Sequence, residues 1–227
     1  YFLRQFEEDK ATGPDLLSAR ILKNCAKQLG VPVAKLARRV LDTGEWPDSW
    51  REHWITPLYK KKSVWDPANY RGVHLTSQVG KAAERLLQKG FAEFFASADC
   101  SGENQFAYKK QRGARDLLAF LVLTWLLGFD CGRKFLLYCS DVAGAFDRVS
   151  AQRLTEKLTA LGVPPDWVRL FSSWLRSREA LVVVGGAYSK VMSLVDMVFQ
   201  GTVWGPVLWN VFYKDAQKAV RDAGFWE

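Results

Sequence analysis

The sequence is poor in residues that bind structural metals, and it has no apolar run of membrane-spanning length. Its four cysteines show no Cys-x-x-Cys spacing and it has two histidines, His53 and His74, which argues against a zinc site and for reduced intracellular thiols. We interpret both histidines as structural. The apolar run 117–129 is interrupted by Thr124 and Gly128 and is shorter than the roughly 20 residues of a membrane helix. Acidic residues at 7–9 also argue against a secretory signal, so we expect an intracellular protein without membrane contact.

The composition is that of a folded, basic protein. The chain has 227 residues, of which 48% are hydrophobic and 14% aromatic, and these values argue against disorder. The formal net charge is +8, of which +6 lies in residues 1–114 and +2 in the remainder. A basic first half favours a polyanionic partner, with nucleic acid preferred over a membrane surface. For charge alone, a solvated surface without a ligand is an equal alternative.

Helices and short strands are interleaved irregularly, which predicts an α+β fold. Apolar residues at helical spacing follow Pro14, and we expect that helix to end at Gly30 and a new one to begin at Pro32 and end at Gly44. Further helices are expected over 77–96, 114–127, 150–161, 165–176 and 207–223. The segments 54–59 and 71–75 are β-prone and predict a basic hairpin, in which Pro57 suits only an edge strand. A second hairpin is expected over 181–194, with its turn at Gly185 and Gly186.

The segment 135–147 has the strongest chemical pattern. Residues 135–139 form a continuous apolar run, which predicts a buried central strand. Asp141 would then stand at the end of that strand, followed by small residues whose backbone amides can approach phosphate oxygens. A carboxylate beside free amides suits Mg²⁺ that carries a nucleoside triphosphate. The equal alternative is that Asp141 caps the helix that follows.

Two further segments are weaker signals when taken alone. Around Gln200 and Gly201, two glycines and a proline precede an apolar helix, and a structural loop explains this pattern at least as well as a binding site. Arg71 follows Lys60 and Lys61 in the predicted basic hairpin, where its guanidinium could hold phosphates. An exposed hairpin without a ligand is the alternative.

In this order, the segments resemble the reverse-transcriptase domain of non-LTR (LINE-type) retrotransposons along nearly the whole chain. Asp141 to Asp147 matches the palm signature D-x-x-x-A-F-D, and Gln200-Gly201-Thr202 with Gly205-Pro206 matches Q-G-S-x-x-x-P. Other segments are similar to family motifs nearer the N-terminus: Lys10 to Asp15, Trp46 to Lys62, Asn69-Tyr70-Arg71 with Lys81 and Glu84, and Glu103 to Tyr108.

The resemblance implies a right-hand polymerase-like fold. Mostly helical fingers would occupy residues 1–134, and a partial palm with antiparallel strands would occupy 135–227. The family's Asp-Asp palm motif has no counterpart, because the sequence contains no Asp-Asp pair. We therefore expect a chain truncated before that motif, without a thumb.

The resemblance also implies the roles of the site residues. Asp141 would be the catalytic, metal-binding carboxylate of a two-Mg²⁺ centre, with a further metal oxygen from the Val142 backbone. Phe146 would be the steric gate that favours deoxynucleotides, while Asp147 would rather anchor the turn than bind metal. The remaining nucleotide-binding residues would be Lys60, Lys61, Arg71, Ala143, Gly144, Ala145, Gln200 and Gly201.

The implied function is RNA-directed DNA polymerisation, with an RNA template, a DNA primer and deoxynucleoside triphosphates as partners. Mg²⁺ would be the cofactor, and by analogy the location would be nuclear. These expectations apply to the full-length parent. With an incomplete metal site, this chain is expected to be inactive by itself, so whether it is an enzyme is left open. The alternative is a non-catalytic nucleic-acid-binding remnant or scaffold with the same fold.

Overall fold

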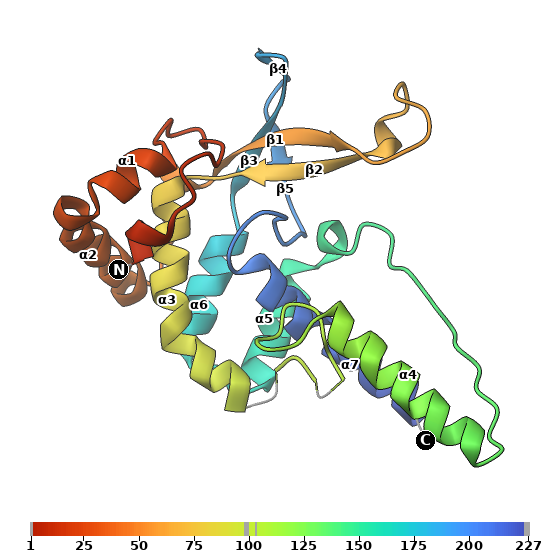
Figure 1. Cartoon of the computed structure of the whole chain (residues 1–227). Helices are drawn as coiled ribbons and strands as arrows, with labels where there is room; N and C mark the ends of the chain where they lie inside the picture. The colour runs from red at the N-terminus through yellow and green to blue at the C-terminus, as the bar shows by residue number, and fades with distance from the viewer. Residues whose placement is uncertain (1, 98–99, 103, 225–227) are drawn as a thin grey trace.

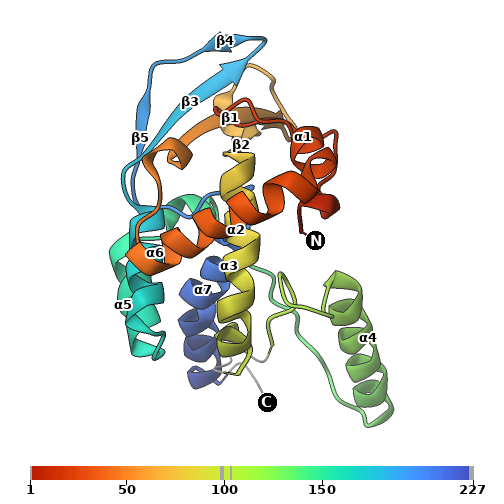
Figure 2. The same ribbon diagram turned by 90° about the vertical axis from the view of Figure 1, so that its left-hand side faces the viewer.

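The structure is a computed structural model that describes residues 2–97, 100–102 and 104–224. A small sheet lies at one end of the molecule, and most of the helices pack beneath it (Figure 1). One helix, α4 (Ala114–Asp130), stands apart from the others, as the view turned by 90° also shows (Figure 2). None of the described helices is long and apolar enough to cross a membrane. The remaining helices are α1 (Ala19–Asn24), α2 (Ala26–Thr43), α3 (Gln78–Ser97), α5 (Ala151–Ala160), α6 (Pro165–Leu175) and α7 (Gly205–Asp222).

The expected boundary between the first two helices is wrong. The chain breaks at Cys25 instead, and α2 continues through Gly30 and Pro32 as far as Thr43. A proline inside a helix removes one backbone hydrogen bond, but the buried face of α2, which includes Val33, packs on α3 and offsets this cost. The predicted end is confirmed: Gly44 caps α2 in the left-handed conformation, with φ of 69°. The later helices lie within a few residues of their predicted ranges.

The sheet has the order β2-β1-β3-β4, with β5 also paired to β3. The expected basic hairpin is formed by the antiparallel pair β1 (Glu52–Tyr59) and β2 (Tyr70–Leu75). β1 is an internal strand, because it also runs parallel to β3 over Glu52 to Ile55. Pro57 lies beyond that stretch and pairs only with Gly72 of β2, so it is still at a local edge. The other strands are β3 (Arg178–Val184), β4 (Ala187–Tyr188) and β5 (Met192–Leu194).

The strand predicted over residues 135–139 is absent. These residues have no regular secondary structure and are exposed, with Leu136 at 97% relative exposure. They belong to an extended segment that leads back from the end of α4 toward the sheet (Figure 1). An apolar run becomes a buried strand only when neighbouring strands pair with it. Within the described residues none does; instead the Phe135 ring contacts Phe129 of α4 at 5.4 Å.

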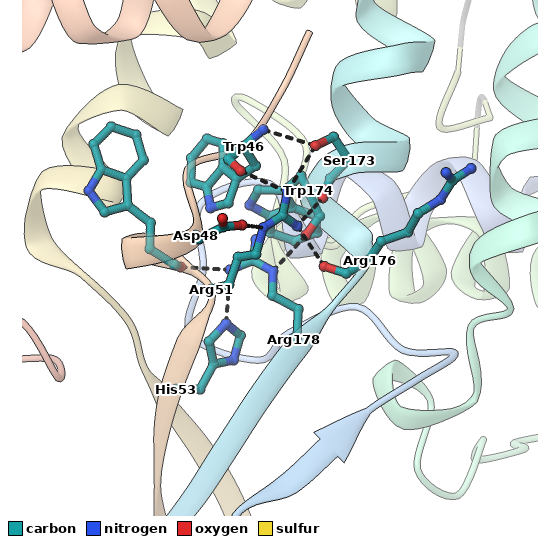
Figure 3. Close-up of polar contacts among 9 residues, drawn as sticks. Trp46, Asp48, Arg51, His53, Ser173, Trp174, Arg176 and Arg178 are labelled. Carbon is teal, nitrogen blue, oxygen red and sulfur yellow. Dashed lines mark hydrogen bonds and ion pairs between the residues drawn. The ribbon is translucent and has the colours of Figure 1, made fainter.

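The main core joins distant parts of the chain. Trp204 lies at its centre, with ring contacts to Phe171 at 5.2 Å, Trp46 at 5.4 Å and Phe91 at 5.9 Å. α2, α3, α5, α6 and α7 all contribute buried residues to this cluster. Nearby, the Arg51 guanidinium donates to carbonyl oxygens of Trp46, Ser173 and Arg176 (Figure 3). The start of β1 is therefore fastened to the end of α6.

Candidate nucleotide site

A pocket of about 700 Å³ collects most of the residues that the sequence singled out. It is bordered mainly by the β1–β2 hairpin, the loop 141–147 and the segment before α7, with further residues from β5 and Tyr108. Lys60 and Arg71 come from the hairpin, Asp141 from the loop and Gln200 from the last region. The other predicted residues that line the pocket are Val142, Ala143, Gly144, Ala145 and Phe146.

The hairpin determines where Lys60 and Arg71 lie. In its antiparallel register Tyr59 faces Tyr70, and Leu58 faces Arg71. The Lys60 amide donates to the Asn69 carbonyl at 2.8 Å, which extends the pairing by one step. Lys60 and Arg71 are thus held near one another, both exposed, and together they make this border of the pocket positive.

The loop 141–147 is a turn rather than a helix cap. Asp141 is exposed and precedes Gly144, whose φ of 62° is in the left-handed region. The Asp147 amide donates to the Gly144 carbonyl at 3.0 Å and closes the turn. The 3-10 helix Phe146–Arg148 begins within this turn, and Ser150, not Asp141, caps α5. Asp141 therefore has no capping role, and its carboxylate is free to meet a ligand at the pocket.

Phe146 is fixed by aromatic neighbours. Its ring stacks on Trp209 of α7, with centroids 5.7 Å apart and planes at 20°, and it meets Tyr108 edge-on at 6.2 Å. The Phe146 carbonyl accepts a hydrogen bond from the Val198 amide at 3.0 Å. The ring also lies close to Gly205, since a Cβ added there would stand 3.6 Å from it. The ring is therefore half-buried, with a defined orientation at the pocket.

The segment Gln200–Gly201 is joined to strand β2. The His74 amide donates to the Gln200 carbonyl at 2.9 Å. Gly201 has φ of 105°, and a Cβ there would lie 2.8 Å from the His74 carbonyl oxygen. Only glycine can adopt this positive φ and also leave room for the His74 carbonyl oxygen. Gly201 itself lines a neighbouring cavity, together with Lys10 and Lys81, rather than this pocket.

Two predicted features therefore lie outside the pocket. Gly201 lines the neighbouring cavity, and Lys61 lies in the hairpin loop, where it is exposed but does not line the pocket. Conversely, several lining residues were given no role by the sequence. Ile55, Tyr70 and Tyr108 fall within motif segments and could have been noticed there. The others lie outside those segments, namely Gly72, His74, Met192, Leu194 and Met197.

A buried polar network lies behind the pocket. His53 and His74 face each other with their Nδ1 atoms 3.0 Å apart. Arg178 Nη1 lies 3.0 Å from His53 Nε2 (Figure 3). Burial is the main cause that lowers the pKa of His74 to about 4, and Arg178 adds to it. Burial and the same guanidinium also hold the pKa of His53 well below its ordinary value. Both rings are therefore neutral at physiological pH.

Glu84 anchors the segment that follows Gln200. Its carboxylate accepts hydrogen bonds from Trp174 Nε1 at 2.9 Å and from the amides of Val203 at 2.6 Å and Trp204 at 3.3 Å. The Trp204 indole also donates to the Glu84 carbonyl at 2.9 Å. Burial raises the pKa of Glu84, against the effect of these donors. This glutamate holds the loop in place and is too deeply buried to meet a nucleotide.

The pocket offers few metal ligands. Its carboxylates are Asp141 and Asp147, and the described residues include no group of three or more His, Cys, Asp or Glu side chains that could hold a metal ion. Mg²⁺ often takes only one or two protein carboxylates and completes its shell with water and substrate phosphates. The residues present thus fit one Mg²⁺ that arrives with a triphosphate, but they do not supply the ligands for two ions.

Comparison with known proteins points to the same family that the sequence motifs resemble. Residues 59–224 match the family described as "Reverse transcriptase (RNA-dependent DNA polymerase)". The chain is 30% identical over 207 residues to the RNA-directed DNA polymerase from mobile element jockey of Drosophila melanogaster. This alignment covers 91% of this chain and 22% of the relative. It is 26% identical over 212 residues to a probable RNA-directed DNA polymerase from transposon X-element of the same species, covering 91% of this chain and 23% of the relative.

The chain thus spans less than a quarter of the length of these relatives. The family match nevertheless covers most of the chain and includes every motif from Asn69 onward. The chain belongs to the reverse transcriptase family, as a domain of the kind found in non-LTR (LINE-type) retrotransposons.

Proposed function

We propose that this chain provides the nucleotide-binding part of an RNA-directed DNA polymerase, in which the pocket holds a deoxynucleoside triphosphate with Mg²⁺. The supporting observation is that Asp141, which is far in the sequence from Lys60 and Arg71 of the hairpin, borders one pocket with them. Two cations for the phosphates and a carboxylate for the metal are the groups that phosphoryl transfer requires. A structural loop would not need this combination.

The cations would bind and orient the triphosphate. Arg71 offers a planar guanidinium that can hold two phosphate oxygens at once, and Lys60 adds a point charge beside it. The exposed amides around Gly144 would donate to further phosphate oxygens. Such positioning is the main contribution that a protein makes to phosphoryl transfer.

Asp141 would hold the metal, with an additional oxygen from the Val142 backbone. When bound, Mg²⁺ would neutralise charge that develops on the phosphates during the transfer. Asp147 would stabilise the turn in the loop 141–147, because its backbone amide donates to the Gly144 carbonyl.

Phe146 would select the sugar. Its ring is held by Trp209 and Tyr108, so it cannot turn aside without loss of these contacts. A ring fixed against the 2′ position would exclude a ribose hydroxyl and admit deoxyribose.

The same proposal assigns residues 1–134 to fingers and 135–227 to a partial palm. An RNA template and a DNA primer would be the other partners, and a nuclear location would follow from the analogy. The two proposed parts share the sheet and the main core, because β1 pairs with β3.

Isothermal titration of the chain with dATP in the presence and absence of Mg²⁺ tests the proposal. We expect Mg²⁺-dependent binding that Asp141→Asn abolishes and Arg71→Ala weakens at least about tenfold, since a charged hydrogen-bonding group contributes about 1.5–3 kcal/mol. Arg39→Ala, a change of an exposed arginine on α2, is the matched control and should bind as the unchanged chain does. Binding that is equally strong in all three variants would contradict the proposed site.

A further inference from the structure

We propose that Trp65, in the loop that joins β1 and β2, is a stacking platform for an unpaired base of a single-stranded nucleic acid. The inference rests on the proposed function, since it adds a contact for the template strand outside the nucleotide pocket. It concerns a residue to which neither the motifs nor the pocket assigns a role.

Trp65 differs from the other tryptophans in its exposure. Its relative exposure is 90%, whereas Trp46 has 2% and Trp204 has none. Among the tryptophans that the structure describes, it alone is exposed. A large aromatic ring left in water gives up the stabilisation that burial would bring, and its faces are open to a ligand.

The loop around Trp65 is built to present the ring. The Asn69 side-chain amide donates to the Ser63 carbonyl at 2.8 Å, and the Tyr70 hydroxyl donates to the Val64 carbonyl at 2.8 Å. The Trp65 amide itself donates to Ser63 Oγ at 3.3 Å. The backbone on the N-terminal side of the ring is thus tied to the base of the loop. Because the backbone that carries the ring is already ordered, little further backbone entropy is lost when a base binds.

The charge around the ring favours a polyanion. Three lysines, at positions 60–62, lie three to five residues before it and are all exposed. The neighbouring carboxylate, Asp66, is occupied by the Ala68 amide at 2.9 Å and by the Asn69 side chain. Basic side chains next to an exposed aromatic ring are the combination with which proteins bind single-stranded nucleic acid.

The ring is also close enough to the pocket to contact the same strand. Trp65 is five residues from Lys60, which lines the pocket, so the two lie at most about 18 Å apart along the chain. A strand that enters the pocket could therefore reach the ring within a few nucleotides. Only an unpaired base offers a free face to such a ring, because a base in a duplex is stacked on both sides.

Fluorescence anisotropy with a labelled single-stranded RNA tests the inference. We expect Trp65→Ala to weaken binding at least about fivefold and Trp65→Phe to retain most of the affinity, because base–aromatic stacking contributes about 1–3 kcal/mol per base. Val64→Ala is the matched control: Val64 is an exposed neighbour in the same loop, and its loss should leave affinity unchanged. The dependence of RNA affinity on salt concentration distinguishes stacking by the ring from attraction by the lysines. Lys61→Ala should make this dependence less steep, whereas Trp65→Ala should leave its slope unchanged.

An oligonucleotide of abasic sites, which keeps the phosphates but lacks bases, completes the test. We expect Trp65→Ala to have no effect on its binding. If the unchanged chain bound no RNA at all, both the proposed template partner and the stacking role would be overturned. If the chain bound RNA and Trp65→Ala bound it equally well, only the stacking role would be overturned. An equal loss on the abasic strand would also overturn it.

Discussion

The Nδ1 atoms of His53 and His74 lie 3.0 Å apart in the buried region between β1 and the pocket. Arg178 has only hydrogen-bond donors, so its Nη1 must donate to His53 Nε2. His53 then carries its proton on Nδ1 and donates it to His74. The direction of the whole chain of hydrogen bonds is therefore determined, and it requires both histidines to be neutral.

The histidine pair makes stability depend on pH in a defined window. Since burial holds the folded-state pKa of both histidines below the ordinary value of about 6.5, with that of His74 at about 4, the unfolded chain binds protons that the folded chain excludes. Above pH 6.5, titration of these two histidines should not change the free energy of unfolding with pH. This free energy should fall by up to about 1.4 kcal/mol per pH unit for each histidine as the pH drops toward 4. Urea unfolding at pH 7.5, 6 and 5 measures this.

The matched variant is His74→Gln, which keeps a polar side chain without a titration near neutral pH. It should be less stable than the unchanged chain at pH 7.5, with a shallower loss between pH 6.5 and 5. An identical slope in both proteins would show that the histidine is not the group responsible.

Removal of the Glu84 carboxylate should be strongly destabilising. Glu84→Ala leaves the Trp174 indole and two loop amides without their acceptor, which costs about 3 kcal/mol or more. In a chain of this size we expect a fall in Tm of at least about 6 °C, measured by circular dichroism. Glu93, exposed on the same helix, gives the control Glu93→Ala, for which little change is expected. A similar Tm for both variants would refute the anchoring role.

Two glycines should respond in opposite directions to the same change. A Cβ on Gly13 would lie 2.4 Å from the Thr76 carbonyl oxygen, whereas one on Gly30 would meet nothing within 4 Å. Gly13→Ala should therefore lower the free energy of unfolding by about 1–3 kcal/mol. Gly30→Ala, within α2, should raise it by about 0.5–1 kcal/mol. Chemical denaturation distinguishes them, and a stabilised Gly13→Ala would contradict the packing described.

Phe146→Ala should reduce the preference for deoxynucleotides. The ratio of dATP to ATP affinity, measured with Mg²⁺, should fall by roughly tenfold, within the ~100-fold that steric rejection of one hydroxyl can supply. Phe146→Tyr keeps the ring and the Trp209 stack and should keep the ratio. An unchanged ratio in Phe146→Ala would remove the basis for the steric role.

Local patterns predicted the local structure well. The hairpin, the αL cap at Gly44 and most helices follow from residues close together in the sequence. Most of the residues to which the motif segments assign a site role border one pocket, except Lys61 and Gly201. Wrong predictions arose where distant contacts decide the outcome. Pro32 is tolerated because α2 packs on α3, and residues 135–139 form no strand because no described strand pairs with them. The Glu84 network could not be predicted, since its partners are 90 to 120 positions away.

The parallel pairing of β1 with β3 also governs the order in which the protein can fold. Arg178, at the start of β3, donates to the Trp50 carbonyl, 128 positions earlier. A growing chain must therefore hold the β1–β2 hairpin without its neighbour until β3 has left the ribosome, and an isolated two-stranded hairpin is at best marginally stable in water. Non-local contacts of this kind slow folding, because loop closure must be achieved before they form. We expect the nucleotide pocket to be among the last parts of the molecule to assemble.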